Sequence, residues 1–193
     1  MPPACRSVRL IPLIALAFPA LAGCGHMPVT SMVRLAQVDL QATDPEKLRV
    51  AVQLPRLLKA RAEGTVLRIT IGLADGSSEA RNFMLRAVAE GDAPAAERGT
   101  EVSTFALTAR DVAELRMFRA ALIARQKGRS GGSLTIALQP DMCRTAPLPD
   151  APVRFTTYLK AAETGGYVPL ARDVDLRTLA RGHDIAGNIS ECR

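Results

Sequence analysis

The sequence predicts a mainly β domain, an antiparallel sandwich-like arrangement of strands with one amphipathic α-helix. Apolar residues alternate with polar ones in roughly seven to nine short segments, separated by turns rich in Gly, Pro and Asp. Only the segment at about 109–127 has the 3.6-residue apolar spacing of a helix. Because helices do not alternate with strands, we do not expect a doubly wound parallel sheet. The alternative is an α+β domain, an antiparallel sheet with the helix on one face.

The strands are placed by their alternation. We expect them at 33–40, 48–54, 67–73, 83–85, 102–107, 134–138, 153–159 and 167–170. Asp75-Gly76 supplies the turn of a hairpin between the third and fourth of these. Residues 56–64 and 89–100 are expected as loops. Pro140 is expected to end the strand before it, because proline cannot donate a ladder hydrogen bond.

The helix has signals at both ends. Thr108 can cap its N-terminus, with Asp111 three residues later in a near capping box. Arg125, Lys127 and Gly128 suit its C-terminus. Its apolar face comprises Val112, Leu115, Phe118 and Leu122. Arg119 interrupts that face, and we expect its stem to pack while its guanidinium reaches water. An interior ion pair and a ligand contact are the alternatives.

Composition bounds the function. The chain has 193 residues, 25 Lys+Arg against 19 Asp+Glu, and 4% aromatic residues without Trp. This length suits a single domain, and the scarcity of aromatics argues against base stacking. The basic residues do not form a cluster, so nucleic acid is not an expected partner. Because the patterns GxSxG, HExxH, Walker A and GxGxxG do not occur, we assign no catalytic residue, no metal site and no cofactor.

Residues 1–23 read as an export signal. Arg6 and Arg9 are the only charged residues before Cys24, and an apolar run follows from Leu10. As a helix, the stretch from Leu10 to Leu21 would span roughly 18 Å, less than the ~30 Å hydrocarbon core of a bilayer. A positive start, a short apolar centre and small residues at the end are typical of a secretory signal peptide.

The end of this segment, Leu21-Ala22-Gly23-Cys24, resembles the lipobox of bacterial lipoprotein precursors. The resemblance covers about two dozen residues and no family is identified for residues 32–193. It implies cleavage between Gly23 and Cys24, a diacylglycerol on the Cys24 sulfur and an acyl chain on its new amino group. Two alternatives remain: Ala20-Leu21-Ala22 also suits ordinary signal peptidase, which would release a soluble protein, and a cytosolic protein can begin with an apolar segment by accident.

The same resemblance implies where the protein is held. Residues 24–31 become a lipid-anchored tether, residues 32–193 a single β-rich domain, and the lipid bilayer a partner through Cys24. Two or three acyl chains are enough for firm anchoring. In enterobacteria an aspartate after the lipidated cysteine retains lipoproteins in the inner membrane. Gly25 therefore favours the outer membrane, facing the periplasm.

The cysteine count agrees with export. Cys5 lies in the removed segment, and lipidation uses Cys24, which leaves Cys143 and Cys192. In the oxidising periplasm we expect these two to form a disulfide. A loop of about 50 residues closed in this way stabilises a fold by roughly 4 kcal/mol in the chain-entropy model. Two unpaired thiols and a metal site are the alternatives.

These observations predict a membrane-anchored envelope lipoprotein that acts as a non-enzymatic docking or scaffolding module for an envelope protein. A second hypothesis is a carrier or sensor of a small apolar or anionic ligand, approached by Arg116 or Arg119. A third is an envelope hydrolase, for which His183 is the only credible base. Asp173, Asp175 and Asp184 could together hold a hard cation, although paired surface aspartates commonly do nothing beyond solvation.

Overall fold

A computed structural model describes residues 29–36, 38, 42–73, 76–126, 132–179 and 188–192 of the chain. The elements, in chain order, are α1 (Val29–Leu35), the 3-10 turn η1 (Pro45–Lys47), β1 (Arg49–Pro55), β2 (Leu58–Leu73), β3 (Ser78–Val88), β4 (Thr100–Leu107), α2 (Ala109–Gln126), β5 (Gly132–Arg144), β6 (Arg154–Lys160), β7 (Val168–Asp175) and α3 (Leu176–Leu179).

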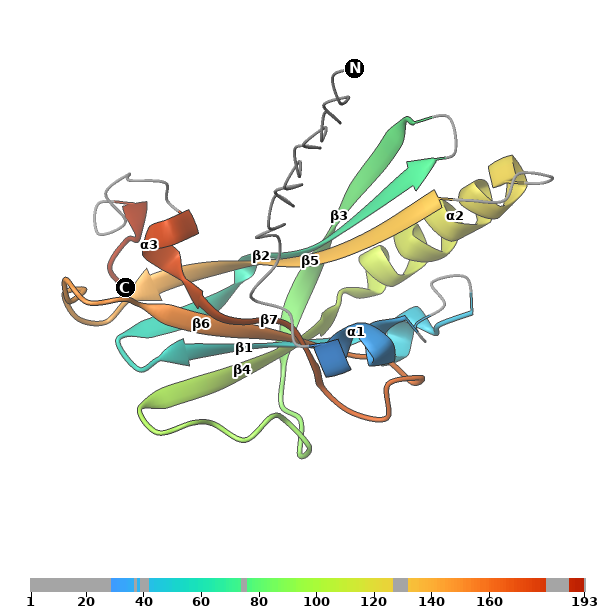
Figure 1. Cartoon of the computed structure of the whole chain (residues 1–193). Helices are drawn as coiled ribbons and strands as arrows, with labels where there is room; N and C mark the ends of the chain where they lie inside the picture. The colour runs from blue at the N-terminus through green and yellow to red at the C-terminus, as the bar shows by residue number, and fades with distance from the viewer. Residues whose placement is uncertain are drawn as a thin grey trace, which may run out of the picture.

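The seven strands form one antiparallel sheet in the order β5-β2-β3-β4-β1-β6-β7. We call β5-β2-β3 the arm and β4-β1-β6-β7 the plate. β3 joins the two, because residues 78–84 pair with β2 and residues 85–88 pair with β4. Figure 1 shows the arm projecting away from the plate with α2 running beside it. The prediction of a mainly β fold with one long helix is confirmed.

The core lies on the inner face of this bent sheet. One continuous cluster joins the inward rows of both parts, including Val52 of β1, Ile69 of β2, Phe83 of β3 and Leu159 of β6, each essentially inaccessible to water. Leu115 of α2 is buried in the same cluster. The alternation seen in the sequence therefore has a single cause, since each strand turns its apolar row toward α2 and the opposing strands.

The predicted helix start is confirmed, and its cap also fastens the helix to the sheet. The Thr108 hydroxyl oxygen accepts from the Asp111 N–H at 3.2 Å, and the hydroxyl donates to the Asp111 carboxylate. The other carboxylate oxygen accepts from the Met84 N–H of β3 at 2.8 Å. Asp111 is buried, so its hydrogen bonds replace those that water would otherwise supply.

The expected strand at 33–40 is wrong at its start, because residues 33–35 belong to helix α1. Ser31 and Val38 are buried and Leu35 packs on the core, a spacing of four and three residues. This is the helical period, and a short apolar run can satisfy both periods. Residues 39–41 lie outside the described part of the chain.

Two further expectations about strand limits are wrong, and one irregularity explains both. β2 begins at Leu58 instead of after residue 64, and β5 continues through Pro140 to Arg144. The pairing of β2 with β5 shifts register between Arg61 and Val66, directly opposite Pro140. Thr65 holds the bulge by accepting from the Asp141 N–H at 3.0 Å and donating to the Arg61 carbonyl. A bulge is a place where a strand tolerates proline.

The other strands are confirmed in place, although β3 begins five residues earlier and β7 ends five residues later than predicted. The hairpin of β2 and β3 turns at Gly76, with a φ of 83°. Asp75, Lys127 and Gly128 lie outside the described residues. Within the described ranges, no helix has both the length and the apolar character needed to cross a membrane.

Candidate functional site

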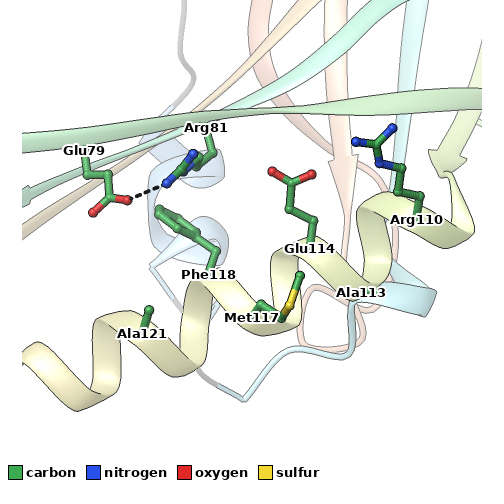
Figure 2. A pocket seen from close by; sticks show the side chains of 8 residues that line it. All are labelled: Glu79, Arg81, Arg110, Ala113, Glu114, Met117, Phe118 and Ala121. Atoms are coloured by element: carbon green, nitrogen blue, oxygen red, sulfur yellow. Dashed lines mark hydrogen bonds and ion pairs between the residues drawn. The ribbon is translucent and has the colours of Figure 1, made fainter.

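The groove between α2 and β3 has a volume of about 610 Å³. Figure 2 shows Arg81 reaching from β3 toward Phe118 of α2, with Glu79 beside it and with Glu114 and Arg110 further along the helix. The Arg81 guanidinium lies 5.8 Å from the centre of the Phe118 ring and 3.2 Å from Glu79 Oε1. The groove therefore has an apolar side and charges of both signs along its rim, a mixture typical of protein-binding surfaces.

The face of α2 next to this groove is apolar and exposed. Met117 is 67% exposed and lines the groove together with the exposed alanines at 113 and 121. Ile123, which is 42% exposed, and Ala120 line the groove on the other side of the helix, beside Arg116 and Arg119. The opposite side of α2 is buried against the core through Leu115 and Leu122. Methionine adapts its shape readily and is frequent at binding surfaces.

The two arginines expected to approach a ligand instead hold the segment before β1. Arg116 Nη2 lies 2.8 Å from Glu46 Oε1, and Arg119 Nη1 donates to the Thr43 carbonyl at 2.5 Å. The shallow groove beside them has a volume of about 350 Å³. Arg119 is half-buried, and its guanidinium binds a backbone carbonyl of the protein instead of reaching water as expected.

The disulfide between Cys143 and Cys192 is present, as predicted, with an S–S distance of 2.03 Å. It joins the end of β5 to residues 188–192. Arg144 extends this attachment. Its N–H donates to the Ser190 carbonyl and its carbonyl accepts from the Cys192 N–H, both at 2.9 Å. Its guanidinium also forms an ion pair with Glu191. The C-terminal segment thus pairs with the end of β5 as a short parallel bridge.

The remaining predicted site residues are not brought together. Asp175 accepts from the Val153 and Arg177 N–H groups, so its carboxylate serves the β7–α3 junction. Asp173 is exposed at the surface, and no group of three potential metal ligands occurs in the described ranges. His183, Asp184 and the whole lipobox, residues 21–24, lie outside those ranges.

The outer face of the plate is a polar layer covered by the loop at 89–99. Glu90 of this loop bonds Arg49 of β1 at 2.6 Å and Lys160 of β6 at 3.1 Å, and Asp92 bonds Lys160 at 2.8 Å. Hydrogen bonding to Asp92 and Glu90 raises the pKa of Lys160, and hydrogen bonding to Lys160 lowers the pKa of Asp92. These contacts hold the loop across β1 and β6.

Two tyrosines lie in this layer with different surroundings. The Tyr158 hydroxyl donates to Gln53 Oε1 at 3.0 Å, and both residues are buried. The Tyr167 ring packs under the Lys160 ammonium, 5.6 Å away, while its hydroxyl has no hydrogen-bond partner in the described structure. Burial raises the pKa of both phenols.

The residues that line the α2–β3 groove were not predicted from the sequence. A signal was present: Glu79 and Arg81 continue the inward row of Phe83 and Leu85, where apolar residues are expected. Charged residues on the core-facing row of a strand indicate that the helix above does not cover it fully. Comparisons with protein-family models, with curated proteins and with solved structures found no match to this chain.

Proposed function

We propose that this protein is a lipid-anchored lipoprotein of a bacterial envelope whose domain is a non-enzymatic docking module. The observation that carries the proposal is Leu21-Ala22-Gly23-Cys24 at the end of a short apolar segment. The acyl chains on Cys24 place the domain on a membrane surface, with the outer membrane facing the periplasm as the proposed location. No cofactor other than these chains is part of the proposal.

The disulfide supports export. Disulfides form and persist in oxidising compartments and are rare in the cytosol. The bond between Cys143 and Cys192 also leaves Cys24 out of any bridge within the domain. Its thiol is therefore available for lipidation, which is the role that its sequence context favours.

The start of α1 supports a close approach to the bilayer. Only residues 25–28 separate Cys24 from Val29, and five residues of extended chain reach about 18 Å at most. A domain of this size has a radius of gyration near 15 Å, so its diameter exceeds that reach. The side of the domain that bears α1 consequently faces the membrane.

The α2–β3 groove is the docking surface of this proposal. Its occupant is a segment of an envelope protein that carries an apolar side chain flanked by charged ones. The apolar side chain fits beside Phe118 and Met117, and the charges of both signs at Arg110 and Glu114 match flanking charges of the opposite sign. The adaptable Met117 and the exposed alanines of α2 suit such a segment.

Membrane retention tests the anchor. We expect the parent chain, expressed from its own first residue, to fractionate with membranes, and a Cys24→Ser variant to be neither processed nor retained in the same way. Cys5→Ser, in the segment that is removed, serves as the matched control and should behave as the parent does. Equal processing and retention of Cys24→Ser would contradict lipid anchoring.

Site-specific crosslinking tests the docking surface. A photoreactive amino acid at Met117 should capture one envelope protein, and the same probe at Met84, which is exposed on the outer face of β3, should not capture it. Ala121→Arg, which fills the groove, should abolish the Met117 adduct while membrane retention persists. Equal capture from both positions, or capture that survives Ala121→Arg, would remove the groove from the account.

A further inference from the structure

A second groove, of about 520 Å³, opens at the edge of the plate where the 89–99 loop returns to β4. Gln53 of β1 and Thr156 of β6 are opposite each other in the strand register and form its floor. Both are buried, with only 4% of each residue accessible. Arg98 stands on the loop side of this groove, and Arg154, at the start of β6, stands on the other.

The hydrogen bonds of the floor leave a donor on each of its two side chains. Gln53 Oε1 accepts from the Tyr158 hydroxyl, so its amide nitrogen is the group left to bind elsewhere. Thr156 Oγ1 accepts from the Asp173 N–H at 3.1 Å, which leaves the Thr156 hydroxyl proton to donate. An amide nitrogen is a donor only, and a hydroxyl whose oxygen already accepts presents its proton. A floor with unused hydrogen-bond donors favours a ligand that has hydrogen-bond acceptor atoms.

The rim adds positive charge to that floor. Arg98 and Arg154 are exposed, and neither guanidinium forms an ion pair or hydrogen bond with another residue of the described structure. Guanidinium groups bind carboxylates and phosphates through paired N–H donors. Both arginines line the groove, so both guanidinium groups can contribute to binding an oxyanion inside it.

Two carboxylates limit what the groove accepts. Glu97 and Asp173 also line it, and each would repel a ligand that is negatively charged throughout. Asp173 has a φ of 53°, the one positive φ among the described non-glycine residues, and its hydrogen bond to Thr156 fixes it at the irregular pairing of β6 with β7. These acceptors match hydroxyl or ammonium groups next to the oxyanion.

We propose that this groove binds a small organic anion, a carboxylate or a phosphate, whose oxygens lie between Arg98 and Arg154 above Gln53 and Thr156. Hydroxyl or amine groups of the same ligand face Glu97 and Asp173. The ligand class agrees with the carrier or sensor hypothesis, but the site lies on the outer face of the plate, away from Arg116 and Arg119. The inference does not depend on Cys24, so lipid anchoring and anion binding can fail separately.

Titration of the detergent-solubilised full-length protein with inorganic phosphate and with sodium acetate, followed by NMR or calorimetry, tests the proposal. We expect saturable binding of at least one anion: a response to phosphate alone identifies a phosphate site, and a response to acetate a carboxylate site. Arg98→Gln and Arg154→Gln should each weaken binding at least about tenfold, the effect of losing one charge-assisted hydrogen bond. Arg86→Gln, at an exposed arginine of β3, is the matched control and should bind as the parent does.

Thr156→Val extends the test to the floor. It keeps the side-chain volume and removes the hydroxyl, so anion binding should fall while thermal unfolding reports whether the plate remains intact. The proposal is overturned if neither anion binds saturably up to about 10 mM, well into the range of weak single-site contacts. It is equally overturned if Arg98→Gln and Arg154→Gln bind as tightly as Arg86→Gln.

Discussion

The arm and the plate belong to one sheet, yet their outer faces differ in burial. β2 of the arm alternates buried and half-buried residues, and β3 turns Met84 and Arg86 to solvent. In the plate, β1 is buried on both faces from Val50 to Leu54, and β6 is buried from Phe155 to Leu159. Polar groups on the outer side of the arm can form hydrogen bonds with water, whereas those on the outer side of the plate are buried and require partners within the protein.

The buried polar contacts of the sheet are therefore concentrated on the outer face of the plate. The outer face of the plate carries Gln53, Thr156 and Tyr158, all buried, and each takes part in a hydrogen bond. A buried polar group without a partner costs about 1–3 kcal/mol. The plate therefore depends on its polar network, while the arm depends on apolar packing and on the attachments at its ends.

The largest loss of stability is expected from removing the disulfide at the end of the arm. Replacing both cysteines, Cys143→Ser with Cys192→Ser, should lower the free energy of unfolding by about 4 kcal/mol, because the bond closes a separation of 49 residues. Denaturant unfolding of the purified, oxidised protein without reductant measures this, and the parent treated with reductant is the control. A loss below about 1 kcal/mol would show that Arg144 and its contacts to residues 189–191 hold the segment without the bond.

The next effect is expected where α2 meets the arm. Asp111→Ala removes the acceptor of the Met84 N–H and of the Thr108 hydroxyl and should cost about 2–3 kcal/mol of unfolding free energy. Glu114→Ala, one turn later on the same helix, should cost less than about 0.5 kcal/mol. Thermal or chemical denaturation of the two variants compares them, and equal losses would contradict the role given to the cap.

Replacing each of the two tyrosines of the plate by phenylalanine should change the free energy of unfolding in opposite directions. Tyr158→Phe removes the donor to Gln53 and should destabilise the fold by about 1 kcal/mol. Tyr167→Phe removes a buried hydroxyl that has no partner in the described structure and should stabilise it by up to about 1 kcal/mol. Chemical denaturation of both variants is the measurement, and a loss of stability in Tyr167→Phe would mean that its hydroxyl is satisfied, for instance by bound water.

Because of the same tyrosines, we expect the free energy of unfolding to decline at alkaline pH. Burial raises the pKa of both phenols in the folded state, so above the unfolded value of about 10 the folded chain holds protons that the unfolded chain has lost. Their contribution is fully present below that pH and is lost as the pH rises toward the folded pKa. Unfolding free energies measured across this range should fall, and the Tyr158→Phe, Tyr167→Phe double variant should show a shallower decline.

Sequence patterns predicted the elements that bury a regular row and failed where exposure or a register shift broke the pattern. β1, the β2–β3 hairpin and α2 follow from local periodicity and caps. The start of β2 was missed because Lys59, Arg61 and Glu63 are exposed there, and the extent of β5 was missed because Pro140 sits opposite a bulge.

The α2–β3 groove left a signal in the inward row of β3, at Glu79 and Arg81, but the groove at the edge of the plate left none. Gln53, Arg98, Thr156 and Asp173 come from three strands and a loop, and only the pairing of β1 with β6 and of β6 with β7 brings them together. The disulfide was predictable because, with Cys5 and Cys24 assigned to the proposed signal and anchor, only one pair of cysteines is left. The resemblance of Leu21-Ala22-Gly23-Cys24 to a lipobox depends on four consecutive residues and needs no knowledge of the fold.

The proposed function depends above all on Cys24 being the lipidated first residue of the mature chain. Intact mass spectrometry of protein extracted from membranes, measured without and with reductant, tests it most directly. We expect a chain that starts at Cys24, carries the added mass of two or three acyl chains, and gains two hydrogens on reduction of the Cys143–Cys192 bond. An unmodified chain, or one that begins at another residue, would contradict it.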